Sequence, residues 1–330
     1  MAKESPLPFR LGPYEILGRV FLAPMAGYTD APFRETAKAC GAAYAVGEMM
    51  TADSALWETR KSEARLRFMP DEHPKTVQLL GADPKALFEA VTLAAQKGVD
   101  VIDLNMGCPV KKVCVKGAGA ALMKDPERAI AVLDAVGQAA KGSSVVATLK
   151  MRLGYDEIAP EALKIALAAQ KAGFAMIVIH ARTRKQGMSG PANWVAVAPI
   201  SKALAIPVVI NGGIDSPEAA AYALEASKAS ALMVGEAALG APWVLREIDA
   251  FLETGKRVET SLSAKKEALA AHWNAHDAFY EESSERLFKK HLKYYEKRVP
   301  GLAPLLGDNF YASRSDAFRD KLSAALEALN

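Results

Sequence analysis

The chain has 330 residues, of which 51% are hydrophobic and 24% are charged, and its formal net charge is +3. This composition is typical of a globular protein with enough apolar residues for one large domain or two ordinary ones. No apolar run is long enough to span a membrane, and residues 1–13 lack the apolar core of a secretory signal. Because the net charge is small, a nucleic-acid partner would have to be bound by a local basic patch.

The cysteines and histidines form no recognisable disulfide or metal pattern. Cys40, Cys108 and Cys114 are too few for a disulfide framework, and Cys108 and Cys114 do not have a zinc-ligand spacing. His272 and His276 are four residues apart on a predicted helix, but no acidic third ligand or His-Glu-x-x-His pattern accompanies them. We therefore expect reduced thiols, a cytoplasmic location and no metal site.

Short strand-like runs alternate with helix-like segments between Arg19 and about Thr254. Strands are predicted at Val20–Ala23, Ala43–Val46, Thr76–Leu79, Val101–Asn105, Val145–Lys150, Met176–His180, Pro207–Asn211 and Ala231–Val234. Alanine-rich amphipathic helices are predicted at Pro84–Lys97, Pro126–Ala140, Glu161–Ala172 and Pro217–Ala226. Strands that are apolar throughout and alternate with helices indicate a parallel sheet covered by helices.

Eight such units predict a (β/α)8 TIM barrel. A doubly wound sheet is less suitable, because no Gly-x-Gly-x-x-Gly motif follows the first strand. From Leu262 to Asn330 the pattern is helical only, with breaks at Val299–Gly301 and Leu306–Asp308, which predicts a small helical bundle. We expect a catalytic barrel domain at residues 1–254 and a helical domain at residues 255–330.

Polar residues and glycines gather where the predicted barrel strands end. In chain order they are Pro24, Met25, Ala26 and Gly27, then Glu48, Gln78, Asn105 and Cys108, then Lys150, Arg152, His180 and Arg182, and finally Asn211, Gly212, Gly213, Gly235 and Glu236. The carboxyl ends of barrel strands form one rim, which carries the active site in enzymes of this architecture. Each residue has a structural alternative, such as a satisfied core histidine for His180, but convergence on one rim favours a single site.

The run Val101–Pro109 ends a buried strand with an amide, Asn105, and a thiol, Cys108, before a long basic loop that reaches Asp125. A thiol in this place is suited to chemistry on an anionic substrate. Its ordinary pKa of about 8.5 makes it a competent proton donor. The alternative is that Cys108 is a small buried apolar residue, as a lone free cysteine usually is.

The remaining rim residues suggest a phosphorylated, redox-active ligand. Glycines at Asn211–Gly213 and at Gly235 allow backbone N–H groups to approach a phosphate closely. Lys150 would place a cation at the barrel mouth, which suits a ligand that gains negative charge, as a flavin does on reduction. Gln78 can donate to and accept from the amide edge of a heterocycle. The set fits a flavin with an acid on the opposite side of a planar substrate.

One predicted helix in the C-terminal region carries a stripe of positive charge. Its members recur at three- and four-residue steps and are Arg286, Lys289, Lys290, Lys293 and Lys297. A charged stripe is most often a solvated face. In a nearly neutral protein, a stripe of one sign favours phosphate contacts.

Several motifs make the sequence resemble the tRNA-dihydrouridine synthases, over nearly the whole chain. Leu22–Asp30 with Pro32-Phe33-Arg34 resembles the family's N-terminal signature, and Asn105–Pro109 with Lys111-Lys112-Val113 resembles its active-site motif. Further matches are Lys150–Gly154, His180–Gly187 and Pro207–Gly212. Resemblance to the bacterial B-type branch is carried by Tyr14–Ile16, Glu48–Met50, and Lys290-His291 with Tyr294-Tyr295.

The resemblance implies an FMN-dependent barrel, a helical RNA-binding domain, and NADPH-driven reduction of the uridine C5–C6 double bond in tRNA. It implies that non-covalently bound FMN gives a hydride to C6 and that Cys108 gives the proton to C5. By the same resemblance, the flavin contacts are Pro24, Met25, Ala26, Gln78, Lys150, His180, Asn211, Gly212, Gly213, Gly235 and Glu236. Asn105, His180 and Arg182 would contact the uracil or the flavin edge, and Arg152 is a further expected substrate contact. The basic stripe adds Lys289, Lys290 and Lys293 as expected contacts to the tRNA.

Two residues depart from the family pattern. Glu236 stands where an arginine usually follows the glycine, so a guanidinium expected at the phosphate is missing, and Gly213 stands where an acidic residue is common. Either FMN binds less tightly or another cation, such as Arg182 or Arg184, replaces the arginine. Two other functions stay open: a flavin barrel enzyme acting on a free small molecule, and a non-catalytic protein that binds flavin and RNA.

Overall fold

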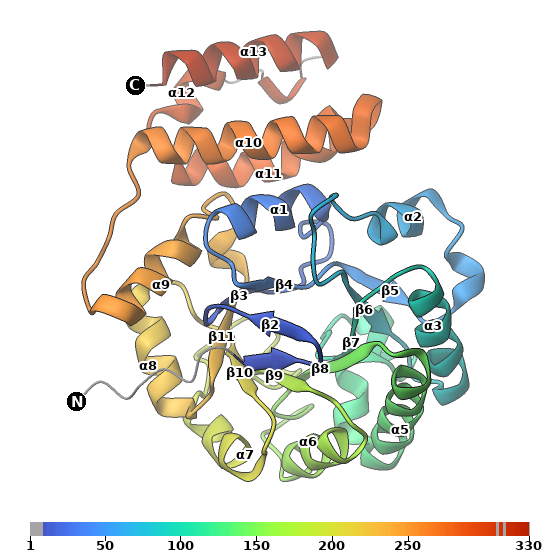
Figure 1. Cartoon of the computed structure of the whole chain (residues 1–330). Helices are drawn as coiled ribbons and strands as arrows, with labels where there is room; N and C mark the ends of the chain where they lie inside the picture. Colours follow the sequence, from blue (N-terminus) through green and yellow to red (C-terminus); the bar gives the residue numbers. More distant parts are fainter. Residues whose placement is uncertain (1–8, 308–309, 313–314, 330) are drawn as a thin grey trace.

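The computed structural model describes residues 9–307, 310–312 and 315–329, in which parallel strands form a ring surrounded by helices (Figure 1). The strands of the ring are β3 (Val20–Leu22), β4 (Tyr44–Ala45), β5 (Met49–Thr51), β6 (Thr76–Leu80), β7 (Val101–Met106), β8 (Val146–Arg152), β9 (Met176–His180), β10 (Val208–Asn211) and β11 (Ala231–Val234). All neighbouring strands pair in parallel, in the order β4-β3-β11-β10-β9-β8-β7-β6-β5.

The ring closes through the segment that joins β4 to β5. These strands lie at the two ends of the hydrogen-bonded order, yet only residues 46–48 separate them in the chain. They are therefore two halves of one interrupted barrel strand, and the predicted (β/α)8 barrel is confirmed. The predicted strand Ala43–Val46 matches β4, but β5 was missed because Gly47 and Glu48 break the apolar strand pattern.

The interior of the barrel is filled by apolar side chains and closed at one end by a hairpin. Phe21, Tyr44 and Met233 belong to the interior cluster, which Leu11 and Ile16 of the hairpin join. This antiparallel hairpin, β1 (Phe9–Leu11) and β2 (Tyr14–Ile16), was not predicted. Because one end of the barrel is plugged in this way, the opposite end, where the strands finish, is left for a ligand.

Among the residues that the structure describes, nine α-helices surround the barrel, and the four that were predicted begin at the predicted residues. They are α1 (Ala31–Ala39), α2 (Arg60–Leu66), α3 (Pro84–Gln96), α4 (Lys111–Cys114), α5 (Pro126–Ser143), α6 (Glu161–Lys171), α7 (Ala198–Ala203), α8 (Pro217–Ser227) and α9 (Val244–Thr254). Asp83, Asp125 and Ser216 each cap a helix that starts with proline. The stretch predicted as a loop from Val110 to Asp125 instead contains α4 and a buried 3-10 helix, Gly119–Lys124.

The C-terminal region is helical, as predicted. It consists of α10 (Leu262–Tyr280), α11 (Ser284–Arg298), α12 (Leu302–Leu306) and α13 (Ser315–Ala328), and α10 and α11 lie next to α1 (Figure 1). Its apolar cluster also includes Ala241 and Trp243 from the end of the barrel. The division into two domains at residue 254 therefore stays a prediction. Within the described part of the chain, no helix combines the length and apolar character that crossing a membrane requires.

Candidate active site

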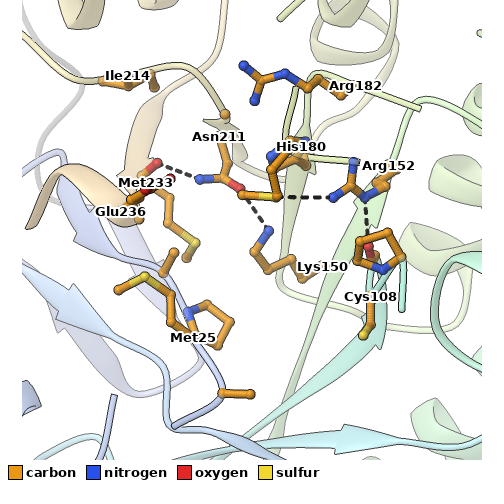
Figure 2. A pocket seen from close by; sticks show the side chains of 18 of the residues that line it. Met25, Cys108, Lys150, Arg152, His180, Arg182, Asn211, Ile214, Met233 and Glu236 are labelled. Atoms are coloured by element: carbon orange, nitrogen blue, oxygen red, sulfur yellow. Dashed lines mark hydrogen bonds between the residues drawn. The ribbon is translucent and has the colours of Figure 1, made fainter. Parts of the chain in front are cut away.

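A cavity of about 510 Å³ opens at the carboxyl ends of the barrel strands (Figure 2). The barrel residues predicted to contact the flavin or the uracil all line it, and so does Cys108: Pro24, Met25, Ala26, Gln78, Asn105, Cys108, Lys150, Arg152, His180, Arg182, Asn211, Gly212, Gly213, Gly235 and Glu236. Gly27 and Glu48 of the predicted rim do not line it, and Gly27 N donates to Glu48 Oε1 instead. The parallel register explains this convergence, because it aligns the strand ends on a common rim. Sequence reasoning missed Met49, Met188, Ile214 and Arg298, which also line the cavity.

Lys150 is held in the cavity by an amide on a neighbouring part of the rim. Its Nζ donates to Asn211 Oδ1 at 2.8 Å, and Asn211 Nδ2 donates to the Met233 carbonyl at 2.7 Å. Burial, together with the charge of Arg152, lowers the pKa of Lys150 to about 8. The amine is therefore mostly protonated at neutral pH and can offer its other N–H groups to an electron-rich ligand.

His180 is a neutral imidazole without hydrogen-bond partners in the cavity wall. Its side chain is 5% exposed, and neither Nδ1 nor Nε2 has a hydrogen-bond partner among the described residues. Burial and the nearby charges of Lys150, Arg152 and Arg182 lower its pKa to about 2. Buried polar groups are nearly always hydrogen-bonded, so an unpaired ring at this position indicates a place where a ligand binds.

Two glycines form a backbone cradle beside His180. Gly212 and Gly213 have φ values of +101° and +73°, which side-chain-bearing residues rarely adopt. A Cβ at Gly212 would lie 3.0 Å from the His180 ring, and one at Gly213 would lie 3.2 Å from the Ala192 Cβ and 3.4 Å from Arg182 Nη2. Glycine thus keeps the backbone accessible there, next to a guanidinium.

Two of the arginines that line the cavity could replace the arginine that the family usually has at position 236. Glu236 is exposed at the cavity, and Arg298, the last residue of α11, lines the same cavity. Of the two substitutes suggested by the sequence, Arg182 lies at the cradle. Arg184 lies over the Tyr155 ring at 5.2 Å and is not among the cavity-lining residues.

Cys108 is held by its backbone and is protonated at neutral pH. Its N–H donates to Asn105 Oδ1 at 2.8 Å, and its carbonyl accepts from Ala120 N at 3.1 Å. Gly119, with φ +61°, allows this approach, because a Cβ there would lie 2.9 Å from the Cys108 carbonyl oxygen. The half-buried thiol has a pKa raised by burial, so it can hold a proton and donate it.

Arg152 connects two loops of the rim. Its Nε donates to the Gly107 carbonyl at 2.7 Å, and its Nη1 donates to the carbonyls of Thr183 and Gly187 at 2.9 and 2.8 Å. Most of its donors are therefore used within the protein. The predicted contact of Arg152 with substrate stays a prediction, and its structural role is to hold the Cys108 loop.

The lysines of the predicted basic stripe of α11 contact aromatic rings and a carboxylate. Lys290 lies over Tyr28 of the barrel at 5.6 Å, whereas Lys293 lies over Tyr311 at 5.1 Å. Lys289 pairs with Glu285 at 2.7 Å. None of these three lysines lines the cavity. The expectation that the stripe binds the phosphates of an RNA stays a prediction.

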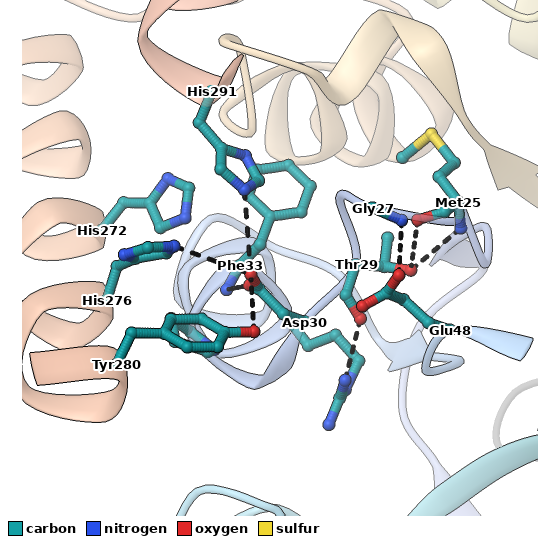
Figure 3. A network of polar contacts seen from close by, with 12 residues as sticks. Met25, Gly27, Thr29, Asp30, Phe33, Glu48, His272, His276, Tyr280 and His291 are labelled. Atoms are coloured by element: carbon teal, nitrogen blue, oxygen red, sulfur yellow. Dashed lines mark hydrogen bonds and ion pairs between the residues drawn. The ribbon is translucent and has the colours of Figure 1, made fainter. Parts of the chain in front are cut away.

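A buried polar cluster joins the barrel to α10 and α11 (Figure 3). Asp30 Oδ2 lies 3.8 Å from Nε2 of His276 and 3.8 Å from Nε2 of His291, and it accepts from the Tyr280 hydroxyl at 3.3 Å. Burial raises the pKa of Asp30, but the hydrogen bond and charge of His291, with the other histidines, outweigh burial and hold this pKa well below its usual value.

The sequence reading of the histidine pair was wrong on one point. An acidic residue does accompany His276, but it is Asp30, which is distant in the chain. Atoms bonded to one zinc ion at about 2.1 Å are roughly 3.4 Å apart, so the 3.8 Å separations from Asp30 Oδ2 to the two imidazole nitrogens are longer than those of a zinc-bound set. The absence of a metal stays a prediction.

The barrel and the polar cavity at its rim are the architecture of a (β/α)8-barrel enzyme. A family model described as dihydrouridine synthase (Dus) matches residues 21–327, and the chain belongs to this family. It is 42% identical over 294 residues to tRNA-dihydrouridine synthase B of Pseudomonas aeruginosa, covering 88% of both chains. It is 44% identical over 293 residues to tRNA-dihydrouridine synthase B of Xanthomonas axonopodis pv. citri, covering 88% of this chain and 87% of the relative.

Solved structures support the fold alone. Histamine dehydrogenase from Rhizobium sp. 4-9 matches with a TM-score of 0.55 and 16% identity, over 80% of this chain and 50% of that one. A 2-naphthoyl-CoA reductase matches with a TM-score of 0.54 and 11% identity, over 75% and 52%. This chain therefore spans about half the length of these two proteins.

Proposed function

We propose that this protein is an FMN-dependent tRNA-dihydrouridine synthase, which reduces the C5–C6 double bond of uridine in tRNA with NADPH as reductant. The observation that carries the proposal is one cavity that contains an unpaired neutral His180, a half-buried Lys150 and a protonated Cys108. Family membership and the names of the relatives support the substrate.

The chain's own residues suit a non-covalent flavin mononucleotide. The Gly212–Gly213 backbone can receive the phosphate, with Arg182 and Arg298 as the cations that Glu236 does not supply. Lys150 and Gln78 would hold the ring, and His180 would pair its ring nitrogens with the flavin or the uracil. Bound FMN supplies the hydride for C6.

Cys108 holds the proton that uracil C5 needs. The thiol is protonated at neutral pH, and its loop is fixed by Asn105 and Arg152. A uracil within a folded RNA reaches such a cavity only if it is flipped out of its stack. Lys290 and Lys293, together with the basic segment after Cys108, would then contact the RNA backbone.

One experiment tests the whole proposal. The purified protein is analysed for bound flavin and is then given NADPH and tRNA from a strain that lacks dihydrouridine at the relevant sites. We expect FMN in the protein and dihydrouridine in the tRNA, and no product from free uridine. Equal turnover of free uridine would instead indicate a small-molecule reductase, and flavin binding without any product would indicate a non-catalytic protein.

A further inference from the structure

Asp103 is a fully buried carboxylate on β7 to which the proposed function gives no role. The strand register places it between Gln78 of β6 and Thr148 of β8. Its Oδ2 accepts from Gln78 Nε2 at 2.7 Å, and its Oδ1 accepts from the Thr148 hydroxyl at 2.7 Å. Both carboxylate oxygens are thus used as acceptors inside the barrel.

A series of hydrogen bonds leads from this carboxylate to the catalytic loop. Because Gln78 donates to Asp103 with its nitrogen, its Oε1 is left to accept from Asn105 Nδ2, at 2.7 Å. Asn105 Oδ1 is then left to accept from the backbone N–H groups of Gly107, at 3.0 Å, and Cys108, at 2.8 Å. Each step determines the orientation of the next amide.

Burial raises the pKa of Asp103, whereas its hydrogen bonds from Gln78 and Thr148 and the charge of Lys150 lower it. With Asp103 ionised, the two ends of this series allow only one orientation of the amides. If Gln78 turned over, its oxygen would face the oxygen of Asp103, and two acceptors would meet. If Asn105 turned over, its NH2 group would face two backbone N–H donors. Gln78 and Asn105 are 2% and 7% exposed, so water cannot readily relieve either conflict.

We propose that Asp103 is a positioning residue that acts through Gln78 and Asn105 to hold the Cys108 loop in place at the cavity. The inference rests on the proposed function, since Cys108 is its proton donor. Because Gln78 and Asn105 both line the cavity, the same series also determines which of their polar atoms face a ligand. The competing explanation is electrostatic: Asp103 would act through its negative charge on Lys150.

Three substitutions separate these explanations. Asp103→Leu removes the acceptor. Asp103→Asn removes the charge but can keep its oxygen towards Gln78 if its NH2 group turns to the Thr148 oxygen. Thr148→Val is the matched control, because it removes the other hydrogen bond of Asp103 and leaves the series intact. If the leucine variant does not fold, Asp103→Ala is measured in its place, since it removes the acceptor without adding bulk.

The first measurement needs no cofactor. In flavin-free protein, the rate of Cys108 alkylation is followed by mass spectrometry of its peptide. Asp103→Leu should change this rate several-fold, whereas Asp103→Asn and Thr148→Val should stay near the wild-type rate. The second measurement is tRNA-dependent oxidation of the reduced, FMN-loaded protein. Asp103→Leu should slow it about 10- to 100-fold, the scale expected for a misplaced reacting group.

A double-mutant cycle provides the decisive comparison. If Asp103 acts through Asn105, then Asp103→Leu should add little to Asn105→Ala in both measurements. Additive effects would overturn the proposal, and so would an Asp103→Asn variant as impaired as Asp103→Leu, which would support the electrostatic explanation. If wild-type protein fails to reduce tRNA, the proposed function is wrong, while the alkylation rates still test the positioning role.

Discussion

Replacing Arg298 with alanine should weaken the binding of FMN and leave the binding of riboflavin unchanged. Arg298 ends α11 and lines the cavity. Glu236 lines the same cavity and stands at the position where the family was expected to have an arginine. Riboflavin has the same ring and ribityl chain as FMN but no phosphate. A residue that contacts the phosphate should therefore affect the two ligands differently.

The structure sets the size of this effect. A hydrogen bond to a charged group contributes about 1.5–3 kcal/mol, which corresponds to roughly 10- to 100-fold in Kd. Arg182 is only 8% exposed beside Gly213, so Arg182→Ala should reach this range. Arg298 is exposed and its charge is screened, so we expect a loss of about 3- to 10-fold, and a smaller loss at high salt.

Flavin fluorescence titration of the flavin-free protein measures both ligands. Lys297→Ala is the matched control, because the neighbouring lysine is not among the cavity-lining residues. Equal losses for FMN and riboflavin in Arg298→Ala, or equal FMN losses in Arg298→Ala and Lys297→Ala, would refute the assignment of Arg298 to the phosphate. Glu236→Arg should tighten FMN binding and leave riboflavin binding unchanged.

Four further results are expected. Cys108→Ala should keep its FMN and its reduction by NADPH but lose about 10²- to 10⁴-fold in tRNA-dependent oxidation, measured by stopped-flow absorbance; a wild-type rate would exclude Cys108 as the acid. FMN affinity should fall as the pH rises through about 8, because Lys150 then loses its proton, and Lys150→Ala should abolish this dependence. Folding stability should fall as the pH drops below 6.5, because His276 binds a proton in the unfolded state but stays neutral in the folded state, where its pKa is lowered to about 3. At pH 5 the loss in the free energy of unfolding is about 2 kcal/mol at most. In urea denaturation, His276→Gln should reduce the difference in stability between pH 7 and pH 5. Joint replacement of Lys290 and Lys293 by alanine should weaken tRNA binding and lower its salt dependence by about two released counterions, so an unchanged slope in filter binding would show that both lysines are solvated.

Much of the site could be predicted because, in a parallel barrel, the carboxyl ends of all strands lie on one rim. Apolar runs identified its strands, and in this fold the residue at the end of each strand reaches the common rim. The position of Cys108 after Val101–Met106, and of Gly212 and Gly213 after Val208–Asn211, therefore placed these residues correctly in one cavity. The proline and aspartate caps likewise located helix starts, because capping is a local interaction.

Other features depend on contacts between distant parts of the chain. No local pattern brings Arg298 of α11 to a cavity formed by barrel strands, or Asp30 to His276 and His291. The unpaired state of His180 is also invisible in the sequence, since it depends on what the folded cavity wall leaves without a partner.

The sequence by itself therefore determined the fold class and the rim residues of this protein, because hydrophobic periodicity and strand ends are local properties. Only the tertiary structure decided the directions of hydrogen bonding, the protonation states and the place of the helical region. Those depend on burial and on neighbours that are far apart in the chain. Asp103 shows the difference: its position on a strand could be predicted, but its control over Gln78 and Asn105 follows only from the register of β6, β7 and β8.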